Sequence, residues 1–269
     1  MSPIRSRFYT ESPFPLFQYL DDIMTILGST KATLFPFLMH EGGNNNVPIR
    51  AYKSARFINP HDESGSAHTL QSENYPYRHP GGVHSYMLHS SDNANFQGDD
   101  STDYEFPTNT AQSVGCWIYA EDITTVTLMS KYDVNNQRHW RLQLDGSSKI
   151  ELESYDESAN ADRTGASDTA VTAREWAFVV ATYDGVNDNA SMSFYLNGAA
   201  DGTGSAKTGA YLSQDVGTAV FTVGATLNTT PAVTNLYHGR IALPFVTGTE
   251  LTAADVLQLH KIGKILLGL

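Results

Sequence analysis

The segment Glu175–Gly198 reads EWAFVVATYDGVNDNASMSFYLNG and contains the clearest strand signals of the chain. Its first part, WAFVVATY, is a nearly continuous apolar run that ends at Asp184-Gly185. Its second part, MSFYL, alternates from one face to the other before Asn197-Gly198. A continuous apolar run is typical of a strand buried on both faces, and Asx-Gly pairs are typical of turns between antiparallel strands. The segment therefore predicts neighbouring antiparallel strands.

Similar patterns flank this segment. SVGCWIY (Ser113–Tyr119) is apolar on both faces, WRLQL (140–144) alternates strictly, and KIELESY (149–155) follows an Asp-Gly turn as the returning strand. AVFTVGA and LYHGRIALPFV supply two more strands. Several strands at hairpin spacing are typical of a sandwich or barrel and not of β–α–β units. We predict an all-β antiparallel sandwich with its core strands in residues 111–251.

Residues 1–30 predict an N-terminal arm followed by a short helix. Pro15 suits the first helical turn, and Gly28 suits the position just after the last one. The apolar face of this helix consists of Phe17, Leu20, Ile23, Met24 and Leu27. Because apolar helical stripes are usually core, the favoured interpretation is that the helix covers the sandwich. The alternative is that this face docks on a partner protein.

Residues 252–269 predict a second short helix and an apolar tail. Thr252 is a good N-cap, Asp255 stands at the capping-box position, and Gly263 is expected to end the helix. The tail KILLGL must then bury itself against its own sandwich or against a neighbouring molecule. Its candidate docking residues are Ile265, Leu266 and Leu267.

Residues 31–269 are expected to form one jelly-roll domain, of which residues 31–110 are a loop-rich first part. This part is rich in Ser, Asn, Asp, His and Gly, which favour turns over long strands. ATLFPFLM (32–39) predicts a strand that Pro36 restricts to an edge or a bulge. GVHSYMLHS (82–90) predicts another.

The whole-chain composition excludes several classes of function. The chain has 269 residues and a formal net charge of −12, so its surface repels nucleic-acid phosphates and anionic membranes. No run of 18 apolar residues is present, and the first residues resemble no signal peptide. We therefore expect the protein to stay in the cytosol or to leave the cell by lysis or another signal-free route. Its one cysteine, Cys116, allows no intrachain disulfide and reads as a buried small hydrophobe.

Five strand and turn motifs, followed by a terminal helix, occur in the order typical of one known family. They are SVGCWIY (Ser113–Tyr119), EWAFVVATYDG (Glu175–Gly185), FYLNG (Phe194–Gly198), Val223-Gly224, Gly239-Arg240-Ile241 and the helix LTAADVLQL. In this order they resemble the laminin-G-like, concanavalin A-like lectin/glucanase modules. The resemblance covers about residues 110 to 262 and implies a jelly roll. Ala242 and Leu243 stand where family members often carry an acidic residue, which argues against a calcium site shared with Glu41.

Upstream, LFPFLMHEGG resembles the opening strand of such modules in bacteriophage virion proteins. This resemblance implies a non-enzymatic structural protein, a capsid decoration or other exterior protein of a tailed bacteriophage. It would bind capsid or other virion proteins on the virion exterior, after assembly in the host cytoplasm, as a homo-oligomer. The alternative is a glycan-binding adhesion module that recognises a host surface glycan. A glycoside hydrolase is a further alternative, less favoured than either.

Two sets of residues contain the side-chain types used in catalytic or metal-binding sites. Glu151 and Glu153 share one face of a strand, as the carboxylates of glycoside hydrolases do, but a solvated outer face is the ordinary interpretation. Catalytic residues are therefore not predicted. His79, His84 and His89 recur at intervals of five, which is not a metal-ligand spacing, so surface or loop histidines are favoured.

Calcium and glycan binding remain hypotheses with named candidates. No cofactor is certain, but acidic loops offer the oxygen ligands that Ca²⁺ accepts. The calcium candidates are Asp92, Asp99, Asp184 and Asp188, with Asx-rich turns as the favoured alternative. Glycan sites need exposed aromatic platforms, for which the candidates are Tyr155, Tyr195 and Tyr211. The tryptophans Trp117, Trp140 and Trp176 lie in apolar strand patterns and are expected in the core.

Overall fold

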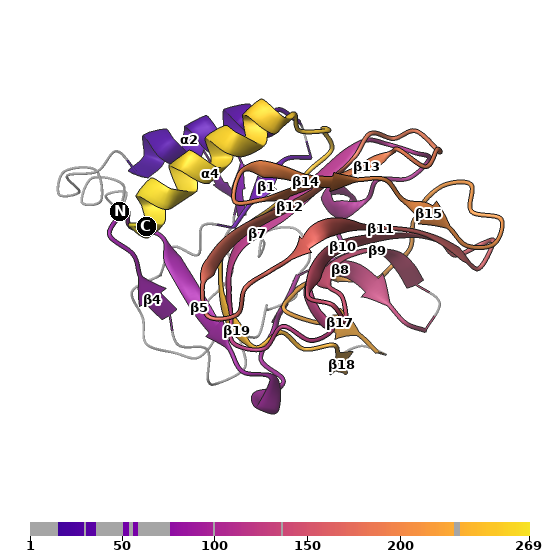
Figure 1. Cartoon of the computed structure of the whole chain (residues 1–269), viewed down its shortest axis with the longest axis horizontal. Coiled ribbons are helices and arrows are strands. Elements are labelled where there is room, and N and C mark those ends of the chain that lie inside the picture. Colours follow the sequence, from indigo (N-terminus) through magenta and orange to yellow (C-terminus); the bar gives the residue numbers. More distant parts are fainter. Residues whose placement is uncertain are drawn as a thin grey trace, which may run out of the picture.

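The fold is described from a computed structural model. The residues that it describes are 16–29, 31–35, 51–53, 56–58, 76–98, 100–135, 137–228 and 232–269. They form two β-sheets that face each other and two helices that lie together on one side (Figure 1). Two short 3-10 helices, Ser90–Asp92 and Thr102–Tyr104, lie in the first part of the chain.

Sheet A contains the antiparallel strands that the segment Glu175–Gly198 predicts. Its described strands are β1 (Thr33–Leu34), β2 (Ala51–Lys53), β3 (Arg56–Ile58), β4 (Pro76–Arg78), β5 (His84–Leu88), β7 (Gln112–Ala120), β12 (Trp176–Tyr183), β13 (Met192–Leu196), β14 (Ala199–Thr203) and β19 (Gly239–Thr247). They run in the order β14-β13-β12-β7-β19-β1-β2-β3, with β5 also paired to β19 and β4 paired to β5. The neighbours β7 and β12 pair antiparallel over the whole length of β12, from Trp176 opposite Tyr119 to Tyr183 opposite Gln112.

Sheet B is the second layer of the sandwich. Its described strands are β6 (Phe96–Gln97), β8 (Val126–Asp133), β9 (Gln137–Leu144), β10 (Lys149–Asp156), β11 (Ala161–Ala170), β15 (Ala206–Lys207), β16 (Phe221–Val223), β17 (Thr226–Leu227) and β18 (Val233–Thr234). They run in the order β15-β11-β10-β9-β8-β16-β6, and β17 joins β8 and β18. The pairings are antiparallel except for the short contact of β17 with β8. The predicted antiparallel sandwich is confirmed.

The main core fills the space between the two sheets. Inward side chains such as Cys116 and Val179 of sheet A meet Trp140, Leu142 and Leu152 of sheet B. The strict alternation of WRLQL thus places its apolar side chains inside and Arg141 on the outer face, as alternation in a half-buried strand requires. Of the three tryptophans, Trp117 and Trp140 are buried as predicted, and Trp176 is partly buried.

The helices α2 (Leu16–Leu27) and α4 (Ala253–Leu267) cover the other face of sheet A (Figure 1). A second apolar cluster lies there, formed by both helices with side chains such as Phe178 and Phe245. The predicted docking residues Leu20, Ile23, Met24, Leu27, Leu266 and Leu267 are buried in this cluster. The docking prediction is therefore wrong for these six, because the chain covers them itself. Ile265 is exposed, and the side chain of Phe17 lies outside the described part.

The cap of α4 is as predicted, but its end is not. Thr252 and Asp255 form the expected capping box, in which each side chain accepts from the other's backbone N–H. The helix then continues through Gly263 to Leu267, and the positive-φ residue Gly268 ends it. Gly263 serves close packing instead, since a Cβ there would lie 2.2 Å from Trp117 Nε1. None of the helices in the described part combines the length and apolarity needed to cross a bilayer.

Replacing Gly263 by alanine should destabilise the protein, although the same change in a free helix interior is stabilising by about 1 kcal/mol. The new methyl group would overlap the indole of Trp117, which is locked in the buried second cluster. Overpacking of this kind costs about 1–3 kcal/mol. Denaturant unfolding should show this loss, whereas the control Gln258→Ala, at an exposed position of α4, should change stability by less than about 0.5 kcal/mol. A more stable Gly263→Ala protein would contradict the packing described here.

Candidate functional site

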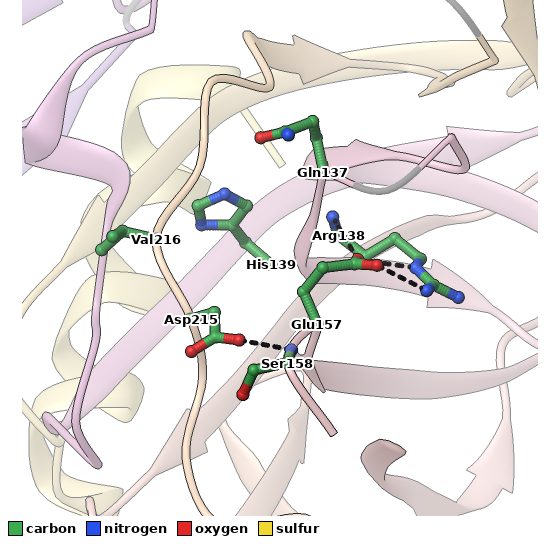
Figure 2. Close-up of a pocket in the computed structure, with 7 residues that line it drawn as sticks. All are labelled: Gln137, Arg138, His139, Glu157, Ser158, Asp215 and Val216. Carbon is green, nitrogen blue, oxygen red and sulfur yellow. Dashed lines mark hydrogen bonds and ion pairs between the residues drawn. The ribbon is translucent and has the colours of Figure 1, made fainter. Parts of the chain in front are cut away.

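A polar cleft lies at one end of sheet B, where β9 begins and β10 ends (Figure 2). Its volume is ≈ 270 Å³. The first residues of β9, the turn after β10 and the segment that crosses them near Asp215 form its walls. The seven residues that line it are Gln137, Arg138, His139, Glu157, Ser158, Asp215 and Val216. We refer to this site as the β9–β10 cleft.

Asp156 fastens the crossing segment to the turn after β10. Its Oδ1 accepts hydrogen bonds from Ser158 Oγ (2.8 Å) and Ala159 N (2.9 Å), and its Oδ2 accepts from Leu212 N (2.9 Å) and Ser213 N (3.4 Å). Burial would raise the pKa of Asp156, but these hydrogen bonds outweigh it and lower the pKa. A carboxylate satisfied in this way fixes the two walls of the cleft relative to each other.

Arg138 and Glu157 form a two-pronged ion pair on the cleft wall (Figure 2). Arg138 Nε donates to Glu157 Oε2 at 2.8 Å, and Nη2 donates to Oε1 at 2.7 Å. The guanidinium also lies over the ring of Tyr155 at 3.9 Å, and its Nη2 donates to Asn160 Oδ1 at 3.1 Å. The hydrogen bond from Arg138 is the main reason that the pKa of Glu157 lies below its ordinary value. The carboxyl group of Glu157 therefore stays ionised at neutral pH.

His139 is a buried, uncharged wall of the cleft. Its side chain is only 1% exposed, and burial, with the nearby charge of Lys131, lowers its pKa to about 4. Nδ1 has no hydrogen-bond partner in the described part of the chain. The backbone of Gly217 lies close to this ring, since a Cβ there would stand 2.8 Å from Nε2. A buried polar atom without a partner is uncommon in folded proteins, and an ordered water molecule is the usual way in which such an atom is satisfied.

Several polar atoms of the cleft retain hydrogen-bonding capacity. Asp215 Oδ2 accepts from Ser158 N at 2.7 Å, whereas Oδ1 accepts no hydrogen bond from the described residues. Gln137 Oε1 accepts from Thr218 N at 2.7 Å. The Nε2 amide hydrogens of Gln137 donate to none of the described residues. Ser158 Oγ donates to Asp156 and can still accept. Val216 adds an apolar surface that is 58% exposed at the rim.

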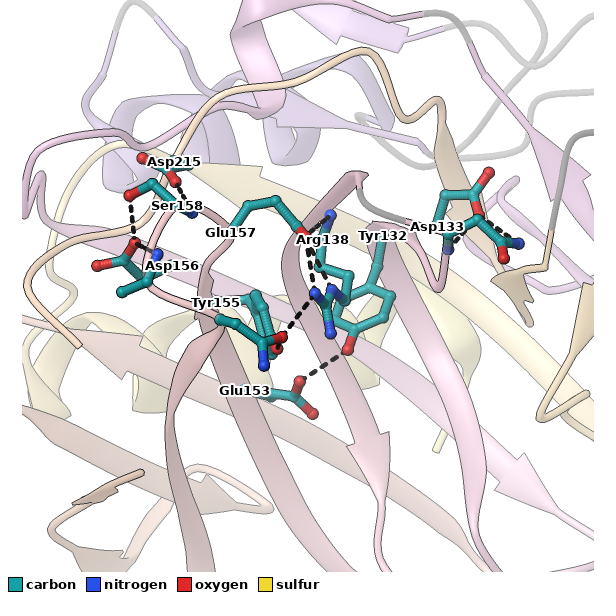
Figure 3. A network of polar contacts seen from close by, with 12 residues as sticks. Tyr132, Asp133, Arg138, Glu153, Tyr155, Asp156, Glu157, Ser158 and Asp215 are labelled. Atoms are coloured by element: carbon teal, nitrogen blue, oxygen red, sulfur yellow. Dashed lines mark hydrogen bonds and ion pairs between the residues drawn. The ribbon is translucent and has the colours of Figure 1, made fainter. Parts of the chain in front are cut away.

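A network of charged and aromatic side chains continues from the cleft along the outer face of sheet B (Figure 3). Tyr132 Oη donates to Glu153 Oε1 at 3.0 Å. Arg141 Nε donates to Glu153 Oε2 at 2.7 Å. The Arg141 guanidinium lies over the Tyr132 ring at 4.8 Å, and that ring meets Tyr155 edge-on at 6.1 Å. The outer-face position of Glu153 is confirmed, but the expectation that it is solvated is wrong, because Arg141 and Tyr132 cover it.

Glu151, the second of the two carboxylates that share this face, lies next to Glu153. Gln143 Nε2 donates a hydrogen bond to it. Burial, with a smaller contribution from the charge of Glu153, raises its pKa. Neither carboxylate lines the β9–β10 cleft.

The three predicted tyrosine platforms are all buried. Tyr155 is 8% exposed beneath Arg138, and Tyr195 is 7% exposed in the cluster beneath the helices. Tyr211 is 2% exposed, with its hydroxyl on Ser154 Oγ at 3.0 Å. None of them presents the open ring face that stacking needs, because each ring is already packed against its own protein. A direct role of these residues in sugar binding stays a prediction that their burial does not favour.

The predicted calcium residues do not come together in the described part. Asp184 Oδ1 accepts from Val186 N at 2.6 Å, and Asp188 Oδ1 accepts from Ala190 N at 2.8 Å, as the alternative of self-satisfied turns expects. The side chain of Asp92 and all of Asp99 lie outside the described residues, as does Glu41. Among the residues described, no three His, Cys, Asp or Glu side chains form a set that could hold a metal ion.

The predicted surface histidines are also placed differently. His79 and His84 are buried, so the expectation of surface positions is wrong for both. His79 Nδ1 lies 3.0 Å from the carbonyl of Leu267, and Nε2 lies 2.9 Å from Ser85 Oγ. The ring thus joins the end of α4 to β5.

The residues of the β9–β10 cleft were not predicted from the sequence. One signal was available, because the Asp145-Gly146 turn fixes the register of β9 and β10, with Trp140 opposite Ser154. Continued by two residues, that register places Arg138 opposite Asp156 and next to Glu157. The sequence contains no comparable signal for the segment that brings Asp215 across the sheet.

Comparison with known proteins identifies the fold family. Residues 88–257, more than half of the chain, match the family described as the concanavalin A-like lectin/glucanases superfamily. No curated protein sequence matches the chain.

Three solved structures share the fold at low sequence identity. The botulinum neurotoxin serotype G binding domain superposes with a TM-score of 0.58 at 17% identity, over 87% of this chain and 51% of that one. The binding domain of Paraclostridial Mosquitocidal Protein 1 gives 0.57 at 11% identity, over 87% and 52%. The botulinum neurotoxin serotype D ligand binding domain, in complex with N-acetylneuraminic acid, gives 0.55 at 15% identity, over 90% and 53%. The chain spans about half the length of these proteins.

Proposed function

This chain belongs to the concanavalin A-like lectin/glucanase superfamily, and on that basis we propose that it is a glycan-binding module whose binding site is the β9–β10 cleft. The observation that carries the proposal is that Gln137, Ser158 and Asp215 line the cleft and keep hydrogen-bonding capacity that no described residue uses. Sugar hydroxyls both donate and accept, so a mixed set of this kind suits them. The exposed Val216 offers an apolar contact beside these groups.

The proposal favours binding over hydrolysis. A glycoside hydrolase needs a carboxyl group with a raised pKa as its proton donor, close to a second carboxylate. In the cleft, Arg138 lowers the pKa of Glu157, so Glu157 does not fit that role. Glu151, whose pKa is raised, is hydrogen-bonded by Gln143 and is not among the residues that line the cleft.

Two botulinum neurotoxin structures of similar fold also support glycan binding. The serotype D neurotoxin domain is described in complex with N-acetylneuraminic acid, and cell entry of botulinum neurotoxin type C is described as dependent on two ganglioside molecules. None of the matches reported above concerns a virion protein, so we place glycan binding ahead of the capsid role expected from the sequence. Attachment to the exterior of a bacteriophage, capsid partners and homo-oligomer formation stay predictions that are compatible with glycan binding.

Replacing Asp215 by asparagine should weaken glycan binding by about tenfold or more. The side-chain carbonyl can still accept from Ser158 N, but the free acceptor becomes an amide donor, and a hydrogen bond to a charged group contributes about 1.5–3 kcal/mol. The test screens the full chain on an array of neutral and acidic oligosaccharides and then titrates the best ligand by calorimetry.

The matched control is Glu175→Gln, an exposed carboxylate that does not line the cleft. It should bind as the unaltered protein does, and thermal unfolding should show that both variants are folded. Absence of saturable binding to any glycan, or an Asp215→Asn protein with unchanged affinity, would overturn the proposed function.

A further inference from the structure

We propose that the β9–β10 cleft selects uncharged sugars and rejects sugars that carry a carboxylate, sulfate or phosphate. This inference rests on the proposed function and names the ligand class of the same site. Its structural basis is the state of Arg138, the single cation among the seven residues that line the cleft. Acidic sugars are held best by a guanidinium that offers two parallel N–H groups to the anion.

Arg138 has no such pair of donors left. Its Nε and Nη2 are both used by Glu157, and Nη2 also donates to Asn160. One face of the guanidinium plane lies against Tyr155. Only Nη1 donates no hydrogen bond to the described residues, so neither edge of the guanidinium can form a two-pronged contact. The positive charge is also neutralised by Glu157, at 2.7 Å.

The remaining charges around the cleft are negative or absent. Asp215 lines the cleft, and the carboxylate of Asp156 lies directly behind the turn. Lys131, whose charge acts on His139, is held by Asp100 and Glu105 in ion pairs. His139 is neutral in this setting because burial lowers its pKa. An entering anion would therefore meet two lining carboxylates and a single cation that is already paired.

The cleft still shows the marks of a ligand site. Besides the unused atoms of Asp215, Gln137 and Ser158, the buried Nδ1 of His139 lacks a partner in the described residues. This atom is independent of the carboxylates and belongs to a side chain that lines the cleft. Carboxylate and amide groups such as those of Asp215 and Gln137 suit hydroxyl groups, which can turn to donate or accept as each partner requires.

The test is an array in which each neutral oligosaccharide is printed beside its sialylated and its sulfated counterpart, for example lactose beside sialyllactose. We expect every neutral sugar that binds to bind at least about tenfold more tightly than its acidic counterparts. Raising NaCl from about 0.05 M to about 1 M should reduce this difference, because salt screens the repulsion. This salt series uses the unaltered protein and needs no variant to fold.

Glu157→Gln should reduce the difference in affinity between neutral sugars and their acidic counterparts. The change removes one negative charge and replaces one of the two oxygens that accept from Arg138 by an amide NH2, which releases one donor of the Nε–Nη2 edge for an acidic group. The ratio of neutral-sugar affinity to acidic-sugar affinity should therefore fall by about tenfold. Glu175→Gln removes the same charge from an exposed site away from the cleft and should alter neither affinity.

The possible outcomes separate the two proposals. If no glycan binds, the proposed function itself fails. If acidic sugars bind as tightly as their neutral counterparts, or if Glu157→Gln folds and leaves the ratio unchanged, glycan binding stands and the selectivity proposed here is wrong.

Discussion

Replacing Arg163 by methionine should lower the free energy of unfolding by about 3 kcal/mol or more. Arg163 lies in β11 and is fully buried, yet no carboxylate among the described residues pairs with it. Its Nη1 donates to Ser205 Oγ at 2.7 Å and to Ser191 Oγ at 3.0 Å. The same guanidinium donates to the carbonyl of Asp188 and the side chain of Asn187.

The expected loss follows from the acceptors that methionine would leave behind. A buried acceptor deprived of its donor costs about 1–3 kcal/mol, and several lose theirs together. Removing a buried charge recovers part of this cost, which limits the net effect. The packing of the guanidinium over Tyr211, at 5.3 Å, would change as well.

Denaturant unfolding of the unaltered protein, Arg163→Met and Arg163→Lys tests this prediction, with Arg174→Met as the control. Arg163→Lys keeps the charge but loses the planar fork, so its stability should lie between those of the other two. Arg174→Met makes the same change as Arg163→Met at an exposed arginine and should alter stability by less than about 0.5 kcal/mol. An Arg163→Met protein as stable as the unaltered one would show that this hydrogen-bond network does not hold the Asn187–Ser191 loop.

Acidification should destabilise the protein well above the pH at which carboxylates titrate. Burial lowers the pKa of His139 from 6.5 to about 4 and also lowers those of His79 and His260. Between these pKa values and 6.5, the histidines bind protons in the unfolded chain but not in the folded chain. The stability that these groups contribute is fully present above pH 6.5 and is lost as the pH falls towards about 4.

For His139 alone, a shift of this size corresponds to about 3 kcal/mol. Its surroundings do not reverse the sign, since Lys131 lowers the pKa while Asp100 and Glu157 raise it by less than burial lowers it. The raised pKa of Glu151 acts in the opposite direction, because the folded chain binds that proton more readily. The lowered pKa values of Asp156 and Glu157 extend the acid sensitivity to lower pH.

Unfolding free energies at about pH 7.5 and about pH 4.5 measure this loss. His139→Gln cannot titrate, so its stability should fall by about 2–3 kcal/mol less over the same interval. His89→Gln, at a partly exposed histidine outside the cleft, serves as the control and should retain the full loss. An identical pH dependence in His139→Gln and the unaltered protein would contradict the burial of this side chain.

The fold could be predicted because the signals for its central strands and its helix cap lie within short segments of the sequence. WAFVVATY and SVGCWIY are each buried almost throughout, which assigns both to the middle of a layered sheet, and Asp184-Gly185 marks where WAFVVATY ends. The capping box of Thr252 and Asp255 is local in the same sense. The prediction that Gly263 ends α4 was wrong, because a glycine is needed there for a tertiary contact with Trp117. No residue spacing within the helix reveals that contact.

The cleft was harder to predict for a related reason. The pairing of Arg138 with Glu157 follows from one hairpin register, but Asp215 reaches Ser158 only because the chain crosses sheet B far along the sequence. Tyr155, Tyr195 and Tyr211 are buried and not exposed as expected. The alternation of a strand predicts which face of the sheet a side chain lies on, but it does not predict what covers that face. Tyr195 points away from the sandwich core and is buried beneath the helices all the same.

The most direct test of the central claim is a crystal structure of the full chain with the neutral oligosaccharide that binds it most tightly. We expect the sugar to occupy the β9–β10 cleft, with hydroxyl groups in hydrogen-bond contact with Asp215 and Gln137 and one sugar face against Val216. A sugar bound elsewhere on the sandwich, with the cleft left to solvent, would contradict the account.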